Sequence, residues 1–109
     1  MDDQINEKFD RIITLFVQEL RNRLGSHLKE AILFGSKARG DDAPDSDYDC
    51  MVILDILSTA LKDTIDDVAG KFLFEHNVVF SVFPILEERY RKQNYNPFLM
   101  NVKKEGIPL

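Results

Sequence analysis

The sequence predicts an α/β domain in which a small mixed β-sheet is flanked by helices. Apolar residues follow helical and strand spacing in the order helix, strand, loop, strand, helix, strand, helix. The chain has 109 residues, which is the size of one domain. Hydrophobic residues make up 44% of it and aromatic residues 10%, enough for a real core. We therefore expect residues 1–109 to form a single domain.

The first half of the chain contains three predicted regular elements around one loop. Apolar residues at three- and four-residue steps predict an amphipathic helix over residues 3–24, which Gly25 ends. The apolar stretch 28–34 predicts a strand. Residues 35–46 are rich in Gly, Asp and Pro and predict a loop with one short helical turn. The segment 47–54 begins polar and ends apolar, as a central strand does when one end opens into a site.

The second half predicts a helix, a strand and a helical tail. Apolar residues at helical spacing from Leu57 to Phe72 predict a second helix, with Ser58 or Thr59 as its cap and its end near His76-Asn77. Residues 78–83 predict a third strand, which Pro84 closes. The charged tail is helical in character, and a last short helix begins at Asn96-Pro97 and runs to Glu105. Four phenylalanines are assigned to packing: Phe72, Phe74, Phe80 and Phe83. Three later side chains are assigned to an exposed edge or a partner contact: Tyr95, Phe98 and Met100.

Charge and composition exclude several classes of function. The formal charge of -5 disfavours direct binding to nucleic acid. The longest apolar runs are too short for a membrane span, so we expect no membrane partner. Cys50 is the single cysteine and the start carries no signal-peptide pattern, so we expect a cytoplasmic protein. His27 and His76 lie far apart with no Cys/His cluster, so any metal should use oxygen ligands.

The segment that carries chemistry runs from Gly35-Ser36 to Asp47-Tyr48-Asp49. Side chains alternate along a strand, so Asp47 and Asp49 project from one face with Cα atoms roughly 6.5 to 7 Å apart. Two such carboxylates repel each other, and a hard cation such as Mg²⁺ relieves that repulsion. Gly35 allows a sharp turn close to a phosphate, Ser36 adds a hydroxyl donor, and nearby basic residues add positive charge.

Two other motifs do not fit the same residues. Gly35 and Gly40 have the spacing of a P-loop, but Asp41-Asp42 follow where that motif needs Lys and Ser or Thr. A calcium loop needs Gly at its sixth position and Glu at its twelfth, where this chain has Cys50 and Ile56. Neither motif explains the segment.

The segment resembles the minimal nucleotidyltransferases of the DNA polymerase beta-like superfamily. Their signature is Gly-Ser, about ten residues, and Asp-x-Asp, and the resemblance covers most of the chain. It implies a nucleotidyltransferase that moves AMP from ATP to a hydroxyl, with Mg²⁺ as cofactor. The resemblance assigns Asp47 and Asp49 to metal binding. It assigns catalysis to Ser36, Asp47 and Asp49, and nucleotide binding to Gly35, Ser36, Lys37 and Arg39.

The resemblance also implies a partner and raises a question about catalysis. Family members of this size act beside a helical HEPN-type protein as the antitoxin of a pair. Catalytic members carry a third carboxylate on a neighbouring strand, whereas residues 78–83 contain no Asp or Glu. Ser81 is the candidate for that position. Two hypotheses follow: an active nucleotidyltransferase, or a module of the same fold that binds nucleotide or partner after losing efficient chemistry.

Overall fold

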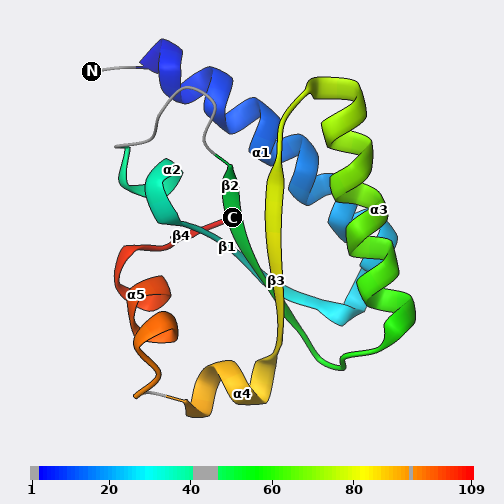
Figure 1. Cartoon of the computed structure of the whole chain (residues 1–109), viewed down its shortest axis with the longest axis vertical. Coiled ribbons are helices and arrows are strands. Elements are labelled where there is room, and N and C mark those ends of the chain that lie inside the picture. Colours follow the sequence, from blue (N-terminus) through cyan, green and yellow to red (C-terminus); the bar gives the residue numbers. More distant parts are fainter. Residues whose placement is uncertain (1–2, 41–46, 94) are drawn as a thin grey trace.

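The computed structural model describes residues 3–40, 47–93 and 95–109, with side chains described from residue 11 onward (Figure 1). Within them lies a four-stranded sheet of order β3-β2-β1-β4. Its strands are β1 (Leu28–Phe34), β2 (Tyr48–Leu54), β3 (Phe80–Leu86) and β4 (Ile107–Pro108). β1 runs antiparallel to β2 and β4, whereas β2 and β3 are parallel. The sheet is therefore mixed, which confirms the predicted fold class.

Two long helices cover one face of the sheet. They are α1 (Asp3–Leu24) and α3 (Thr59–His76), and Figure 1 shows them together on one side of the sheet. A short 3-10 turn, η1 (Gly25–His27), connects α1 to β1. The side chains between these helices and the strands form the larger core: Ile13, Phe16, Val17, Leu20, Leu24, Leu28, Ala31, Leu33, Cys50, Val52, Leu54, Ile65, Val68, Phe72 and Phe80. Cys50 is fully buried in this core as predicted, and this burial raises the pKa of its thiol to about 12.

The other face carries shorter helices, namely α4 (Glu87–Lys92) and α5 (Pro97–Glu105). A smaller core lies beneath them: Ile32, Met51, Ile53, Leu99 and Val102. Since alternate residues of β2 enter the two cores, this strand is buried on both faces. Burial on both faces explains why the predicted central strand ends in a continuous apolar run rather than in alternating apolar and polar residues.

Most predicted ends of elements are confirmed. The first helix and first strand have the predicted bounds, and the loop contains the predicted helical turn as α2 (Gly35–Arg39). Ser58 is the cap of α3, because its hydroxyl accepts from the Leu61 backbone N–H at 3.1 Å. Asn96 caps α5 as predicted, with Pro97 in its first turn. Residues 41–46 of the loop lie outside the described residues.

Three expectations about packing and strand ends are wrong. The third strand begins at Phe80 rather than at Val78, and Pro84 does not close it, because β3 continues to Leu86. As the edge strand, β3 tolerates a residue without a backbone donor. β4 was not predicted at all. Phe74 is 90% exposed and does not pack in the core. Phe83 is 39% exposed and packs against the rings of Phe34 and Phe98, outside the two cores. None of the helices in the described residues is long and apolar enough to cross a membrane.

Candidate active site

Three polar side chains meet where β2 begins beside β3. Asp47 directly precedes β2, and Asp49 is paired with Ser81 in the parallel register. The Ser81 hydroxyl Oγ donates a hydrogen bond to Asp47 Oδ2 at 3.2 Å. The backbone N–H of Tyr48 donates to the Val79 carbonyl at 2.9 Å, which fixes the start of β2 against β3. Ser81, the candidate for the position of a third carboxylate, therefore lies beside both aspartates.

Strand alternation decides which face these groups occupy. Tyr48 packs against the larger core under α1 and α3, and its ring stacks on Phe80 with centroids 4.9 Å apart. Asp49 and Ser81 alternate with these two residues and therefore project toward the face that carries α5. The smaller core does not cover this end of the face, and Asp49 is accordingly only half-buried.

Gly35 brings the other half of the motif to the carboxylates. It follows Phe34, which is paired with Asp49 in the antiparallel β1–β2 register. Its φ of 78° lies in the left-handed region, and a Cβ at this position would collide with the Asp49 carboxylate. Glycine is required here for both reasons. Ser36 follows at the start of α2, and its carbonyl accepts from Gly40 N–H at 2.9 Å to close the turn.

The carboxylate pair is electrostatically strained. Partial burial raises the pKa of Asp49, the neighbouring Asp47 carboxylate raises it further, and the Arg39 guanidinium opposes both effects. Mg²⁺ in proteins is bound by oxygen ligands, mainly carboxylates, and its charge relieves the repulsion between them, so Asp47 and Asp49 fit a divalent cation. Within the described ranges, no group of three or more His, Cys, Asp and Glu side chains is arranged around a metal position.

The two cations predicted to bind the nucleotide point in different directions. Lys37 places its ammonium over the Tyr48 ring, 4.7 Å from the centroid, on the face opposite Asp49. Arg39 lies on the Asp49 side and forms an ion pair with Glu105 of α5 at 3.2 Å between Nη1 and Oε2. Of the two, Arg39 lies near enough to the carboxylates to influence Asp49, so it is the stronger candidate for a phosphate contact.

Comparison with known proteins identifies the family of this chain. Residues 13–105 match the family described as "Nucleotidyltransferase domain". The chain belongs to this family. Two curated relatives come from Methanocaldococcus jannaschii. "Putative protein adenylyltransferase MJ0604" is 33% identical over 97 residues, 89% of this chain and 93% of the relative. "Putative protein adenylyltransferase MJ0141" is 30% identical over 97 residues, 88% and 93% of the two chains. The chain is thus an enzyme of the nucleotidyltransferase class.

Solved structures confirm the fold of this nucleotidyltransferase domain. A toxin-antitoxin structure with AMP-PNP aligns with a TM-score of 0.59 at 20% identity, over 85% of this chain and 68% of the other. A mutant of the toxin-antitoxin MntA-HpeT gives 0.60 at 18% identity, over 87% and 69%. A putative nucleotidyltransferase from Sulfolobus solfataricus gives 0.55 at 21% identity, over 90% and 76%.

Sequence reasoning missed an aromatic cluster near the candidate site, although it assigned Phe83 to packing and Phe98 to an exposed edge or a partner contact. Phe34, Phe83 and Phe98 contact one another with ring centroids 5.4 to 5.7 Å apart. Phe34 precedes Gly35, and Phe83 lies two residues beyond Ser81 on the same face of β3. Strand alternation alone could have placed Phe83 beside Ser81. The position of Phe98 depends on how α5 packs, which spacing in the sequence does not reveal.

Proposed function

We propose that this chain is a Mg²⁺-dependent adenylyltransferase that moves AMP from ATP to a hydroxyl group of a partner protein. The observation that carries the proposal is the approach of Gly35 to Asp49, which brings the Gly-Ser turn against the carboxylate pair. Membership of the nucleotidyltransferase family and the names of the two curated relatives support the reaction class and a protein acceptor.

In the proposed reaction, the acceptor oxygen attacks the α-phosphorus of ATP. The new oxygen–phosphorus bond forms as the bond to the bridging oxygen breaks, and pyrophosphate leaves with the β- and γ-phosphates. Asp47 and Asp49 would hold the ion, which supplies positive charge against the phosphate oxygens. Gly35 and Ser36 contact the triphosphate, where the Ser36 hydroxyl and nearby backbone donors meet its oxygens. The hydroxyl proton of the acceptor passes to a carboxylate of the pair.

We further propose that the acceptor is a helical HEPN-type toxin and that this chain is its antitoxin. Two of the solved structures with the same fold are described as toxin-antitoxin complexes, one of them with AMP-PNP. The net charge of -5 supports a protein rather than a nucleic acid as the acceptor. The protein encoded beside this chain is the first acceptor to test.

One observation favours a second function. Ser81 is the candidate for the place of a third carboxylate, and its hydroxyl donates to Asp47 without adding negative charge. A site with two carboxylates binds a nucleotide more readily than it activates a hydroxyl. The second candidate is therefore a nucleotide- or partner-binding module with slow chemistry.

A transfer assay separates the two functions. The purified chain, Mg²⁺ and ATP labelled at the α-phosphate are incubated with the product of the neighbouring reading frame, and protein-bound label is measured. The variant Asp47→Asn/Asp49→Asn should abolish labelling. The matched control Asp63→Asn/Asp66→Asn removes the same charge from exposed positions of α3 and should label normally. Labelling that survives the first variant would disprove the assigned site, and Mg²⁺-ATP binding without labelling would support the module.

A further inference from the structure

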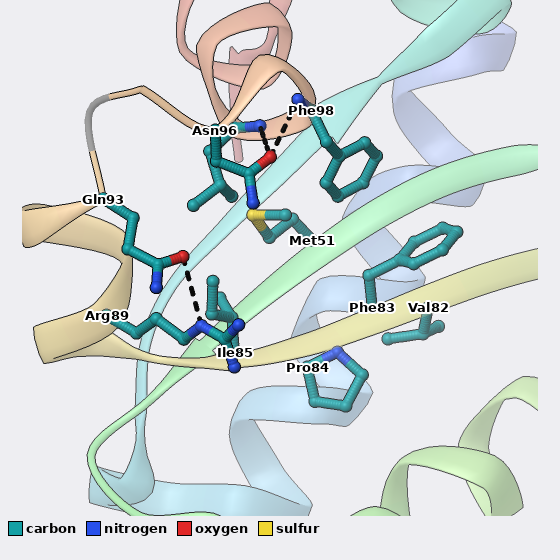
Figure 2. A pocket seen from close by; sticks show the side chains of 10 residues that line it. Met51, Val82, Phe83, Pro84, Ile85, Arg89, Gln93, Asn96 and Phe98 are labelled. Atoms are coloured by element: carbon teal, nitrogen blue, oxygen red, sulfur yellow. Dashed lines mark hydrogen bonds between the residues drawn. The ribbon is translucent and has the colours of Figure 1, made fainter.

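A pocket opens on the α5 face of the sheet, one step beyond the carboxylates. It has a volume of about 290 Å³ and lies between the end of β3, α4 and α5 (Figure 2). Its floor includes Met51 and Phe83, which are two residues beyond Asp49 and Ser81 in the same strands and face the same way. At roughly 3.3 Å per strand residue, the Cα atoms of Met51 and Phe83 lie about 6 to 7 Å along the strands from those of Asp49 and Ser81.

The walls of the pocket are apolar and aromatic. Phe98 is 43% exposed and Phe83 39%, although both rings touch each other and Phe34. The phenylalanines of the larger core are buried, whereas the rings of Phe83 and Phe98 are partly exposed and line the pocket. Half-open aromatic rings give a planar ligand a surface to stack on, and such stacking contributes about 1–3 kcal/mol per nucleobase.

The polar groups of the pocket are mainly donors. Asn96 Oδ1 accepts from the backbone N–H groups of Phe98 and Leu99, at 2.9 and 3.3 Å, as the cap of α5. This fixes the orientation of the amide, and its nitrogen points into the pocket toward Met51 (Figure 2). No described residue accepts a hydrogen bond from that nitrogen. The lining contains no carboxylate.

The outer end of the pocket carries two more polar side chains. Arg89 Nε donates to Gln93 Oε1 at 3.2 Å, which leaves the amide nitrogen of Gln93 and the terminal guanidinium nitrogens of Arg89 without a partner among the described residues. A ligand with ring-nitrogen acceptors on a flat apolar ring satisfies both the donors and the aromatic walls. A purine base has this chemistry.

We propose that this pocket takes the purine base of the nucleotide and that Asn96 and Phe98 determine its recognition. The inference rests on the proposed function, which places the phosphates at Gly35 and Asp49. A volume near the lower limit for small-molecule sites fits a base with part of its sugar, while the phosphates lie outside over the carboxylates. The purine stacks on Phe98, and a ring nitrogen accepts from the Asn96 amide.

The variant Asn96→Asp tests this proposal without removing the helix cap. Asp and Asn are equivalent caps, and a negative charge suits a helix N-terminus, so α5 and the melting temperature should be preserved. The change replaces the donor that points into the pocket with an acceptor. The control Gln18→Glu adds the same charge to an exposed position of α1, which packs on the other face of the sheet. Phe98→Leu is the second variant, because it keeps an apolar side chain and removes the aromatic face.

Calorimetry in the presence of Mg²⁺, with ATP and with inorganic tripolyphosphate, separates the contribution of the base to binding from that of the phosphates. We expect the native protein to bind ATP at least about tenfold more tightly than inorganic tripolyphosphate. Asn96→Asp and Phe98→Leu should each weaken ATP about fivefold or more, and should leave tripolyphosphate within about twofold of the native affinity. Gln18→Glu should change neither affinity.

The failures of the two proposals have different signatures. If ATP and tripolyphosphate bind equally well to the native protein, or if Asn96→Asp weakens both alike, the base does not occupy this pocket and the phosphate site stands. If neither ligand binds, the proposed function fails and the pocket assignment fails with it.

Discussion

Ser81 and Asp47 are joined by a hydrogen bond of 3.2 Å between the serine hydroxyl and the carboxylate Oδ2. The contact links the edge strand β3 to the residue that precedes β2, and it lies next to Asp49. A serine here relieves the repulsion that a third carboxylate would add beside a pair already under electrostatic strain. The hydrogen bond therefore ties the first carboxylate to the edge strand, and the predicted behaviour of the site follows from these groups.

The first prediction concerns the cost of the carboxylate pair to the fold. Partial burial and the Asp47 carboxylate raise the pKa of Asp49, so ionised Asp49 destabilises the native state at neutral pH. Asp49→Asn should therefore raise the melting temperature by roughly 2–4 °C, the shift that about 0.5 kcal/mol gives in a domain of this size. Acidification below the ordinary pKa of aspartate should remove the difference. A lower melting temperature for the variant at neutral pH would contradict the prediction.

Magnesium provides the complementary measurement. The ion should raise the melting temperature of the native protein and should not affect Asp49→Asn, since the variant lacks one of the two proposed ligands. Asp66→Asn, which removes a charge from an exposed position of α3, should respond to magnesium as the native protein does.

The second prediction separates the two constraints on Gly35. Gly35 and Gly40 have nearly the same φ, 78° and 79°, but a Cβ at Gly40 would meet nothing within 4 Å. Gly40→Ala should cost about 1–2 kcal/mol for the left-handed backbone alone. Gly35→Ala should cost more, because Asp49 must also move, and it alone should weaken Mg²⁺-ATP binding. Equal losses in urea denaturation, with ATP affinity unchanged in both, would show that the approach to Asp49 is unimportant.

The third prediction tests Ser36 as a donor to the triphosphate. Its side chain makes no hydrogen bond that holds the described part of the fold together, so Ser36→Ala should leave the melting temperature nearly unchanged. A donor oriented toward developing negative charge is worth about 10²-fold in rate. We expect that loss in the labelled transfer assay. An unchanged rate, or an unfolded variant, would exclude Ser36 from the proposed role.

Much of the fold could be predicted because its elements follow simple periodicities. The helix caps at Ser58 and Asn96 and the alternation in β2 are local signals, and local signals are visible in a sequence. The end of β3 was predicted wrongly because a strand can continue through Pro84 only where it lies at the edge of the sheet, and the sequence does not show which strand lies there. β4 has two residues, too few for any periodicity, and its neighbourhood is fixed by Leu109 N–H donating to the Ala31 carbonyl at 2.8 Å.

The candidate site divides in the same way. The spacing of Asp47 and Asp49 and the strand position of Ser81 depend on alternation, and the structure brings all three together. The aromatic contact between Phe34 and Phe98 joins residues far apart in the chain. It arises from tertiary packing of α5 on the sheet, for which the sequence pattern of one chain contains no signal.

The fourth prediction concerns pH and lies away from the site. His27 Nδ1 and Asp55 Oδ1 are 2.9 Å apart, and this hydrogen bond is the main cause that lowers the pKa of Asp55. A lowered carboxyl pKa contributes stability above the ordinary value and loses it as the pH falls through the lowered one. His27→Ala should therefore raise the titration midpoint of the Asp55 carboxyl carbon, followed by NMR between about pH 2 and 6. The pair is exposed, so the effect on melting should be small.

The last prediction restores the carboxylate that β3 lacks. Ser81→Asp places a third carboxylate beside Asp47 and Asp49, since Ser81 is paired with Asp49 and touches Asp47. Without magnesium the added repulsion should lower the melting temperature, and saturating magnesium should reverse the loss. If the missing ligand limits turnover, transfer should increase by about tenfold or more. Ser81→Ala is the control, because it removes the hydrogen bond to Asp47 and adds no ligand. A native protein that already transfers AMP rapidly, with Ser81→Asp neutral or harmful, would show that another group completes the site and would exclude the binding-module function.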